Sequence, residues 1–211
     1  MCYNRRVGIL GGTFDPIHIG HLLLAESARD YFNLDEVLFI PSGHSYMKEN
    51  VSEKQFRASV TAKAIENNPC FTLSRFEFNK SGNSYSYETV SALATQNPMT
   101  EYYFIIGGDT IFALEEWQHP ELLFANCIIV AGIRKGYSLQ EIQSKIASLQ
   151  KKYSADIRLF TTARVDVSST DIRDRINLGQ SIQYMVPDII KDDILKHYNH
   201  IGDVRDDGED D

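Results

Sequence analysis

Short apolar runs alternate along the chain with longer stretches whose apolar positions recur at helical spacing. The chain shows no internal repeat and no low-complexity linker before its acidic end. The pattern predicts helices over 21–32, from Ser52 to about Asn67, from Ser138 to about Tyr153, from Ser168 to Gly179, and from Pro187 to His200. It predicts strands at 7–10, 36–40, 72–78, 102–106, 127–131 and 157–160.

Two of these helices carry a start signal, because Ser52 is followed by Gln55 and Ser138 by Glu141, each pair forming a potential capping box. Several strands are continuous apolar runs, as expected of parallel strands that are covered on both faces. The fold class predicted is therefore α/β, a Rossmann-like doubly wound parallel sheet with helices on both faces. In such sheets ligands bind beyond the carboxyl ends of the strands, so the loops that follow the strands are where chemistry is expected.

Composition narrows the class of protein. The 211 residues carry a formal net charge of -8, and 43% are hydrophobic, which suits one globular domain. We expect a single domain over 1–201 and a disordered acidic tail over 202–211. Without a long apolar run, a signal peptide or a basic cluster, we expect a cytoplasmic protein whose partners are neither nucleic acid nor membrane. The three cysteines have no metal or disulfide spacing, so we expect reduced, mostly buried thiols.

The densest motif is the segment 11–21, GGTFDPIHIGH, which follows the first strand. Gly11 and Gly12 allow the backbone to approach a ligand closely, and the helix that opens at Gly20 and His21 offers free N–H groups to an anion. His18 and His21 are three residues apart and can point their imidazoles to the same side. Neither the dinucleotide-binding fingerprint nor the Walker pattern is present. The segment predicts a phosphate cradle without a lysine loop.

A second motif is the segment 167–176, VSSTDIRDRI, after the strand that ends near Phe160. The hydroxyls of Ser168, Ser169 and Thr170 lie at a helix start, with Arg173 one turn in, and together they are suited to the β- and γ-phosphates of a nucleotide. A simple serine N-cap on a helix closed by Gly179 is the alternative interpretation.

The string H-x-G-H after GGTFDP resembles the signature of the nucleotidylyltransferase superfamily, and the segment 167–173 resembles its I-S-S-T-x-I-R element. Further matches from Gly8 to about Pro187 resemble the bacterial nicotinate mononucleotide adenylyltransferases. The resemblance implies that AMP is transferred from ATP to nicotinate mononucleotide, giving pyrophosphate and the deamido dinucleotide precursor of NAD.

The resemblance also implies roles for residues between the two motifs. The segment 82–89, GNSYSYET, is similar to the G-x-S-Y-T-x-x-T stretch that lines the pyridine nucleotide pocket, and 105–109, IIGGD, to the I-I-G-A-D strand end that holds adenosine. Trp117 stands where the family stacks a tryptophan on the nicotinate ring, although core packing is an equal alternative. The implied ATP-binding residues are Gly11, Gly12, Thr13, Phe14, Gly107, Asp109, Ser168, Ser169 and Thr170. The implied mononucleotide-binding residues are Asp15, Ser84, Tyr85, Thr89, Trp117 and Arg134.

One segment departs from the family. Where the family usually reads P-P-H-K, residues 45–48 read SYMK. Lys48 is kept and is placed to meet the triphosphate, but Met47 replaces the loop histidine, whose role is then absent or supplied by His44. Tyr46 is closer to the A-Y-x-K pattern of eukaryotic enzymes, so nicotinamide mononucleotide is an alternative acceptor.

In the implied reaction a phosphate oxygen attacks the α-phosphorus of ATP, and no protein nucleophile is needed. Catalysis rests on alignment and on offsetting charge, which we assign to His18, His21, Lys48 and Arg173. Mg²⁺ is expected, held chiefly by the nucleotide and water, with no protein metal site. The alternatives are a sister adenylyl- or cytidylyltransferase, such as pantetheine-phosphate adenylyltransferase, and a nucleotide-binding regulator without turnover. The oligomeric state, including a homo-oligomer, stays open.

Overall fold

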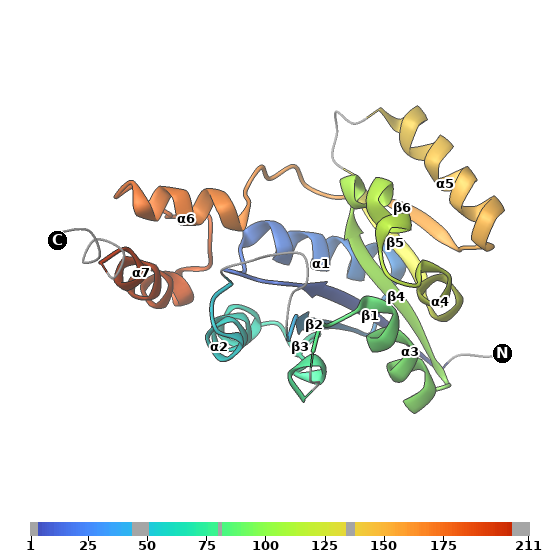
Figure 1. Ribbon diagram of the computed structural model, residues 1–211, viewed down its shortest axis with the longest axis horizontal. Coiled ribbons are helices and arrows are strands. Elements are labelled where there is room, and N and C mark those ends of the chain that lie inside the picture. The colour runs from blue at the N-terminus through green and yellow to red at the C-terminus, as the bar shows by residue number, and fades with distance from the viewer. Residues whose placement is uncertain (1–3, 44–50, 80–81, 134–137, 204–211) are drawn as a thin grey trace.

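The computed structural model describes residues 4–43, 51–79, 82–133 and 138–203. Its centre is a six-stranded sheet in which every neighbouring pair is parallel, in the order β3-β2-β1-β4-β5-β6 (Figure 1). The strand order reverses between β1 and β4, which makes their carboxyl ends the switch point of the sheet. The strands are β1 (Arg5–Gly12), β2 (Glu36–Pro41), β3 (Phe71–Leu73), β4 (Thr100–Gly107), β5 (Ile128–Ile133) and β6 (Ile157–Thr161).

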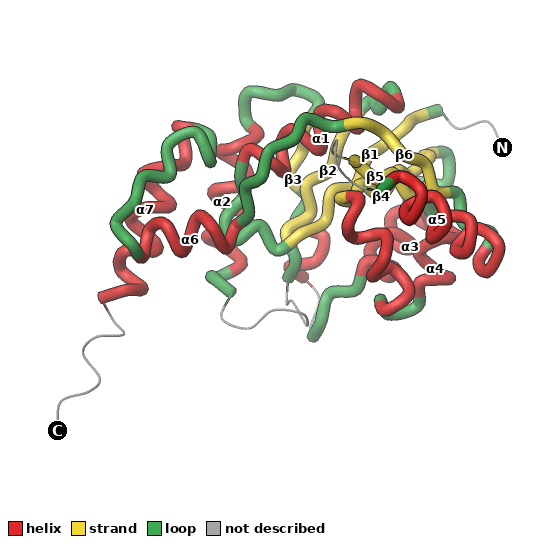
Figure 2. The backbone as a smooth tube through the Cα atoms, turned by 90° about the horizontal axis from the view of Figure 1, so that it is seen from above, coloured by secondary structure: helices red, strands yellow, loops and turns green. Residues whose placement is uncertain are grey.

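Helices cover both faces of this sheet, as the doubly wound prediction requires (Figure 2). The first face is covered by α1 (Ile19–Phe32) and α2 (Lys54–Ile65). α6 (Ser169–Asn177) and α7 (Asp188–Asp203) lie beyond the sheet and extend the same core, with α7 packed on α2 and on α6 (Figure 1). The second face is covered by α3 (Ser86–Gln96), α4 (Pro120–Asn126), α5 (Leu139–Tyr153) and the 3-10 segment η2 (Gly108–Glu116). A further 3-10 turn, η1, spans Phe76–Asn79.

Alternation along the strands creates two separate cores. In β4, Tyr103 and Ile105 belong to the core of the first face, whereas Phe104 and Ile106 belong to that of the second. Both sets are buried, which explains why the strand is a continuous apolar run in the sequence. The predicted parallel, doubly covered sheet is therefore confirmed.

Two local predictions are wrong. The strand expected at 72–78 is shorter, because β3 ladders only to Val37, Leu38 and Phe39 of β2 before the chain turns into η1. The capping box expected at Ser52 does not form, since α2 begins at Lys54 with Glu53 at the N-cap and the Ser52 hydroxyl donates to Tyr198 instead. At Ser138 the predicted cap is confirmed: its hydroxyl accepts from the Glu141 N–H.

The cysteines are reduced, as expected, where the structure describes them. Cys70 and Cys127 are free and only half-buried, while Cys2 lies outside the described residues. Within the described part of the chain, no helix is long and apolar enough to cross a membrane.

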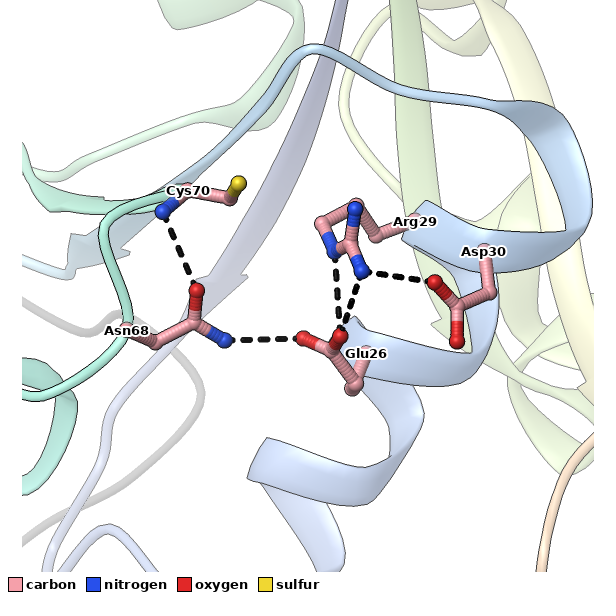
Figure 3. A network of polar contacts seen from close by, with 5 residues as sticks. All are labelled: Glu26, Arg29, Asp30, Asn68 and Cys70. Atoms are coloured by element: carbon pink, nitrogen blue, oxygen red, sulfur yellow. Dashed lines mark hydrogen bonds and ion pairs between the residues drawn. The ribbon is translucent and has the colours of Figure 1, made fainter.

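A polar network on the flank of α1 fixes the helix that follows the first motif (Figure 3). Arg29 donates to Glu26 at 2.7 Å and to Asp30 at 2.6 Å, and Asn68 donates to the other Glu26 oxygen at 2.8 Å. The bonds from Arg29 hold the pKa of Glu26 below its usual range. Because the Asn68 side chain also accepts from the Cys70 N–H, the network ties α1 to the connection between α2 and β3.

Candidate active site

The first motif forms the turn from β1 into α1, with His18 at the N-cap of the helix. The ring centroids of His18 and His21 lie 3.7 Å apart, so the structure brings the two imidazoles together as predicted. The His18 backbone N–H donates to Nδ1 of His21 at 3.3 Å. An imidazole nitrogen that accepts carries no proton, so a neutral His21 presents its N–H at Nε2.

Gly20 is required between these histidines. A Cβ at this position would lie 3.0 Å from two atoms of the His18 ring and 3.6 Å from the Val167 carbonyl oxygen. A methyl group there would push the buried His18 ring out of place. The glycine of H-x-G-H therefore lets the helix start pack closely against Val167, the first residue of the second motif.

At the end of β1, beside the switch point, Gly11 and Gly12 have different surroundings. A Cβ on Gly12 would lie 3.1 Å from the ring of Phe14, while one on Gly11 would make ordinary contact with Phe104 at 3.7 Å. Phe14 has a left-handed backbone, with φ of 49°, and its buried ring meets His21 edge-on at 5.0 Å. Phe14 thus supports His21 from inside the core, and a contact of this residue with ATP remains a prediction.

The second motif lies against the first, although about 150 residues separate them. Ser169 donates to the Pro16 carbonyl at 2.8 Å, and the Arg173 guanidinium donates to the Asp15 carbonyl. Arg173 also donates to the Thr170 hydroxyl at 3.2 Å. The start of α6 therefore meets the loop that carries both histidines, at the carboxyl edge of the sheet.

The cap of α6 is also an ordinary helix cap. Ser168 accepts from the Asp171 N–H at 3.0 Å, and the Asp171 carboxylate accepts from the Ser168 N–H at 2.9 Å. Hydrogen bonds from Ser168 hold the pKa of Asp171 below its usual range. The N-cap interpretation is confirmed, and it leaves the phosphate role open because both can coexist at one helix start.

The loop after β4 carries the residues expected to meet adenosine and the pyridine ring. Trp117 caps the end of η2, half-buried, with its ring edge-on to Phe104 at a centroid distance of 6.1 Å. Since Phe104 also lies beside Gly11, Trp117 flanks the switch point on the second face. Asp109 is exposed in the first turn of η2, and a Cβ on Gly107 would lie 2.6 Å from its carboxylate.

The segment similar to the pyridine nucleotide pocket shapes the loop after β2. Ser84 accepts from the Gly43 N–H at 3.2 Å, and Thr89 donates to the buried Glu77 carboxylate at 2.8 Å. A Cβ on Gly43 would lie only 2.4 Å from the Glu77 carbonyl oxygen, so this position needs a glycine. Tyr85 is at the N-cap of α3. Ser84 and Thr89 thus have protein partners here, and their contacts with the mononucleotide remain predictions.

Arg57 of α2 is a residue of this site that the sequence motifs do not indicate, and it is only 2% exposed in relative terms. Its guanidinium donates to three backbone carbonyls: Ser52 at 2.9 Å, Thr13 at 2.6 Å and Ser42 at 2.7 Å. Burial lowers the pKa of Arg57, and the Asp15 carboxylate acts in the opposite direction. The signal in the sequence is weak: an arginine on a helix face that also carries Val60, Thr61 and Ile65.

Asp15 also faces inward. Its Oδ1 accepts from the Tyr198 hydroxyl at 2.6 Å, and its Oδ2 accepts from the Ser52 N–H at 3.3 Å. The mononucleotide contact implied for Asp15 stays a prediction, while the structure gives both of its carboxylate oxygens protein partners.

Several predicted residues lie outside the described residues: Lys48 and Arg134, together with His44, Tyr46 and Met47. Within the described part of the chain, no group of three or more histidine, cysteine, aspartate or glutamate side chains is placed to hold a metal ion. Carboxylates near the two motifs, such as those of Asp15 and Asp171, have protein partners.

Comparison with known proteins agrees with this geometry. The model of the cytidylyltransferase-like family matches residues 9–175. A "probable nicotinate-nucleotide adenylyltransferase" of Lachnoclostridium phytofermentans is 42% identical over 195 residues, covering 92% of this chain and 98% of the relative. A protein of Leifsonia xyli with the same name is 37% identical over 193 residues, covering 92% of each chain.

Among solved structures, the Plasmodium falciparum nicotinic acid mononucleotide adenylyltransferase complexed with NaAD has a TM-score of 0.77 and 18% identity, covering 93% of this chain and 98% of that one. At this identity the likeness supports the fold. Fold, paired histidines and family model together define a cytidylyltransferase-like nucleotidyltransferase. More closely, the chain belongs to the nicotinate-nucleotide adenylyltransferase family.

Proposed function

We propose that the protein transfers AMP from ATP to nicotinate mononucleotide, releasing pyrophosphate and forming the deamido dinucleotide precursor of NAD. The observation that carries this proposal is the meeting of the paired-histidine turn with the start of α6 at the switch point. Relatives at 37 to 42% identity that bear the name of this activity support it.

The reaction forms a bond between a phosphate oxygen of the mononucleotide and the α-phosphorus of ATP, and breaks the bond from that phosphorus to the oxygen bridging to the β-phosphorus. No covalent enzyme intermediate is required, because the attacking phosphate is already ionised. The protein contributes alignment and donors that meet the developing charge. We assign this work to His18 and His21 at the α-phosphate, and to Arg173 and Lys48 at the departing pyrophosphate.

In the proposed geometry both substrates meet at the switch point, beyond the carboxyl ends of β1 and β4. In this arrangement ATP lies along 11–14 and the start of α6, with its ribose at Asp109. The mononucleotide lies on the side of α3 and Trp117, where the half-buried indole offers a π face to an electron-poor ring. Arg134 and the segment 84–89 complete its pocket.

Mg²⁺ is proposed to arrive with ATP and to be held chiefly by the nucleotide and water, which fits carboxylates of Asp15 and Asp171 that already have protein partners. The proposed partners are small nucleotides, ATP and the pyridine mononucleotide. Because these nucleotides are present in the cytoplasm, the cytoplasm is the proposed location of the enzyme.

The test is pyrophosphate release from ATP and Mg²⁺ with nicotinate mononucleotide, nicotinamide mononucleotide and phosphopantetheine in parallel. We expect release with nicotinate mononucleotide at the highest kcat/KM. A higher kcat/KM with nicotinamide mononucleotide would make that nucleotide the preferred acceptor, and it would give the SYMK segment at 45–48 a role in selectivity. Release with phosphopantetheine alone would reassign the protein to the sister activity, and binding of ATP without any release would make it a regulator.

A further inference from the structure

The C-terminal helix contacts the first motif through the side chain of Tyr198. We propose that Tyr198 of α7 is a positioning residue for adenylyl transfer, acting through the Asp15 carboxylate on the loop that carries His18 and His21. This inference rests on the proposed function, because it concerns the geometry of the same site. Its physical basis is the contact between the Tyr198 hydroxyl and Asp15 Oδ1 at 2.6 Å, made across 183 residues of sequence.

Asp15 cannot keep its position without such a partner. The residue is only 5% exposed in relative terms, and a buried carboxylate is costly unless it accepts hydrogen bonds. Its second oxygen has a weaker partner, the Ser52 N–H at 3.3 Å. Burial and the bond to Asp15 raise the pKa of Tyr198, so the phenol keeps its proton and remains a donor at neutral pH.

The backbone around Asp15 is where the two motifs are joined. The Asp15 carbonyl accepts from Arg173, and the next carbonyl, that of Pro16, accepts from Ser169. His18 follows only three residues later. A displacement of Asp15 therefore moves the start of α6 relative to the histidines, and in a reaction that depends on alignment a shift of about 1 Å costs about 100-fold in rate.

The helix that carries Tyr198 is docked by other contacts. His197 stacks on Phe56 of α2 at a centroid distance of 3.6 Å with an interplanar angle of 14°, and its Nε2 lies 3.0 Å from the Ser52 hydroxyl. Lys63 of α2 pairs with Asp193 at 2.6 Å. Removing the Tyr198 hydroxyl therefore leaves these contacts of α7 in place. It withdraws the donor to Asp15 and the acceptor of the longer bond from the Ser52 hydroxyl, which keeps His197 as a partner.

Arg57 of α2 provides a second support for the loop that carries Asp15. It donates to the Thr13 carbonyl, two residues before Asp15, and its charge lies near the Asp15 carboxylate. Asp15 is thus set between a phenol from α7 and a buried cation from α2. Of these two supports, the phenol hydroxyl can be removed by a change to phenylalanine that keeps the ring, whereas removing the Arg57 side chain would leave a cavity and three carbonyls without this donor.

The experiment compares Tyr198→Phe with the matched control Tyr103→Phe. Tyr103 is also buried, and its hydroxyl also donates to a carboxylate, that of Glu101 at 2.7 Å, but at the amino end of the strands. We measure kcat and both KM values well below the melting temperature of each variant. For Tyr198→Phe we expect kcat to fall about tenfold or more, with each KM within about threefold of the wild-type value. For Tyr103→Phe we expect kcat within about twofold.

An unchanged kcat in Tyr198→Phe, or equal losses in both variants, would overturn the proposal. A double-mutant cycle with an Asp15 variant supplies the second readout. Asp15→Ala is used if it folds, and otherwise Asp15→Asn is used. If Tyr198 acts through Asp15, adding Tyr198→Phe to the Asp15 variant lowers kcat by less than it does in the wild type, whereas additive losses contradict this route. All rates are expressed as ratios to the wild-type rate with whichever acceptor the wild type uses. Failure of the positioning role is therefore distinguishable from failure of the proposed function, in which case the wild type would release no pyrophosphate.

Discussion

The two edges of the sheet are held together in different ways. At the carboxyl edge, side chains from distant elements donate to backbone carbonyls, as Arg57 does to Thr13 and Ser42 and Ser169 does to Pro16. At the amino edge the strand starts are joined by exposed ion pairs, such as Arg5 with Glu36 at 2.5 Å. Exposed pairs contribute about 0 to 1 kcal/mol, whereas a buried donor fixes the position of the carbonyl it meets.

Packing follows the same division. A cavity of about 260 Å³ lies at the amino edge, lined among others by Pro98, Tyr102, Phe124 and Asn126. At the carboxyl edge, several glycines stand where a Cβ would collide with a neighbour, as at Gly20 and Gly43. Because the proposed function aligns the substrates at the carboxyl edge, substitutions at the two edges should affect catalysis and stability differently.

The largest effect is expected from His21→Ala. Removing an oriented donor to charge that develops in the transition state costs about 3 to 4 kcal/mol, so kcat should fall roughly 10²- to 10³-fold. His18→Ala should act similarly, with part of the loss in the KM for ATP, because its ring is buried beside Gly20. Steady-state pyrophosphate release measures both. A His21→Ala variant with near-normal turnover would remove His21 from the mechanism.

Two glycine variants separate the shape of the site from the stability of the fold. In Gly43→Ala the new methyl would lie 2.4 Å from a backbone oxygen, so the loop must shift, and we expect a loss of about 1 to 3 kcal/mol in the free energy of unfolding together with lower kcat/KM. In Gly11→Ala the methyl makes only ordinary contact, at 3.7 Å. That variant should retain its stability and lose activity. Denaturant unfolding and kcat/KM check both, and parallel losses in the two variants would contradict the distinction.

The sequence predicted the carboxyl edge in part, and the reason is physical. Strand positions follow from local hydrophobicity, and the paired histidines with their glycine follow from one contiguous segment. Arg57 and Tyr198 could not be predicted, because their partners are a backbone carbonyl and a carboxylate that only the folded chain brings within reach. A contact with the same tyrosine also accounts for the absence of the predicted cap at Ser52, whose hydroxyl donates to Tyr198.

The unpredicted helices were missed for a different reason. α4 has seven residues, fewer than two full turns, and its proline start gave no periodic pattern. α3 begins within the segment 82–89 that resembles a substrate pocket, and its buried residues are Thr89, Val90 and Leu93. Short helices are stabilised by packing against the sheet, so their own sequences carry little signal.

A smaller, selective effect is expected from Trp117→Ala. If the indole stacks on the pyridine ring, the KM for the mononucleotide should rise about tenfold while the KM for ATP changes little. Trp117→Phe is the matched variant, since it keeps a π face and should recover most of the affinity. Equal increases in both KM values would show that the edge-on contact with Phe104, and therefore core packing, is what Trp117 provides.

The smallest effect is expected where an ion pair joins the carboxyl-edge segment η2 to α5. Glu115 accepts from Lys145 and from Lys152, and these bonds lower its pKa from 4.5 to about 2. Because the folded-state pKa is depressed, the pairs stabilise the fold above the unfolded value of 4.5, and this contribution is lost as the pH falls towards 2. Glu115→Gln should therefore lower the denaturant midpoint slightly at pH 7 and not at all near pH 2. Arg5→Ala, at the amino edge, is the comparison, and a Glu115→Gln difference that persists in acid would mean that the side chain acts through packing.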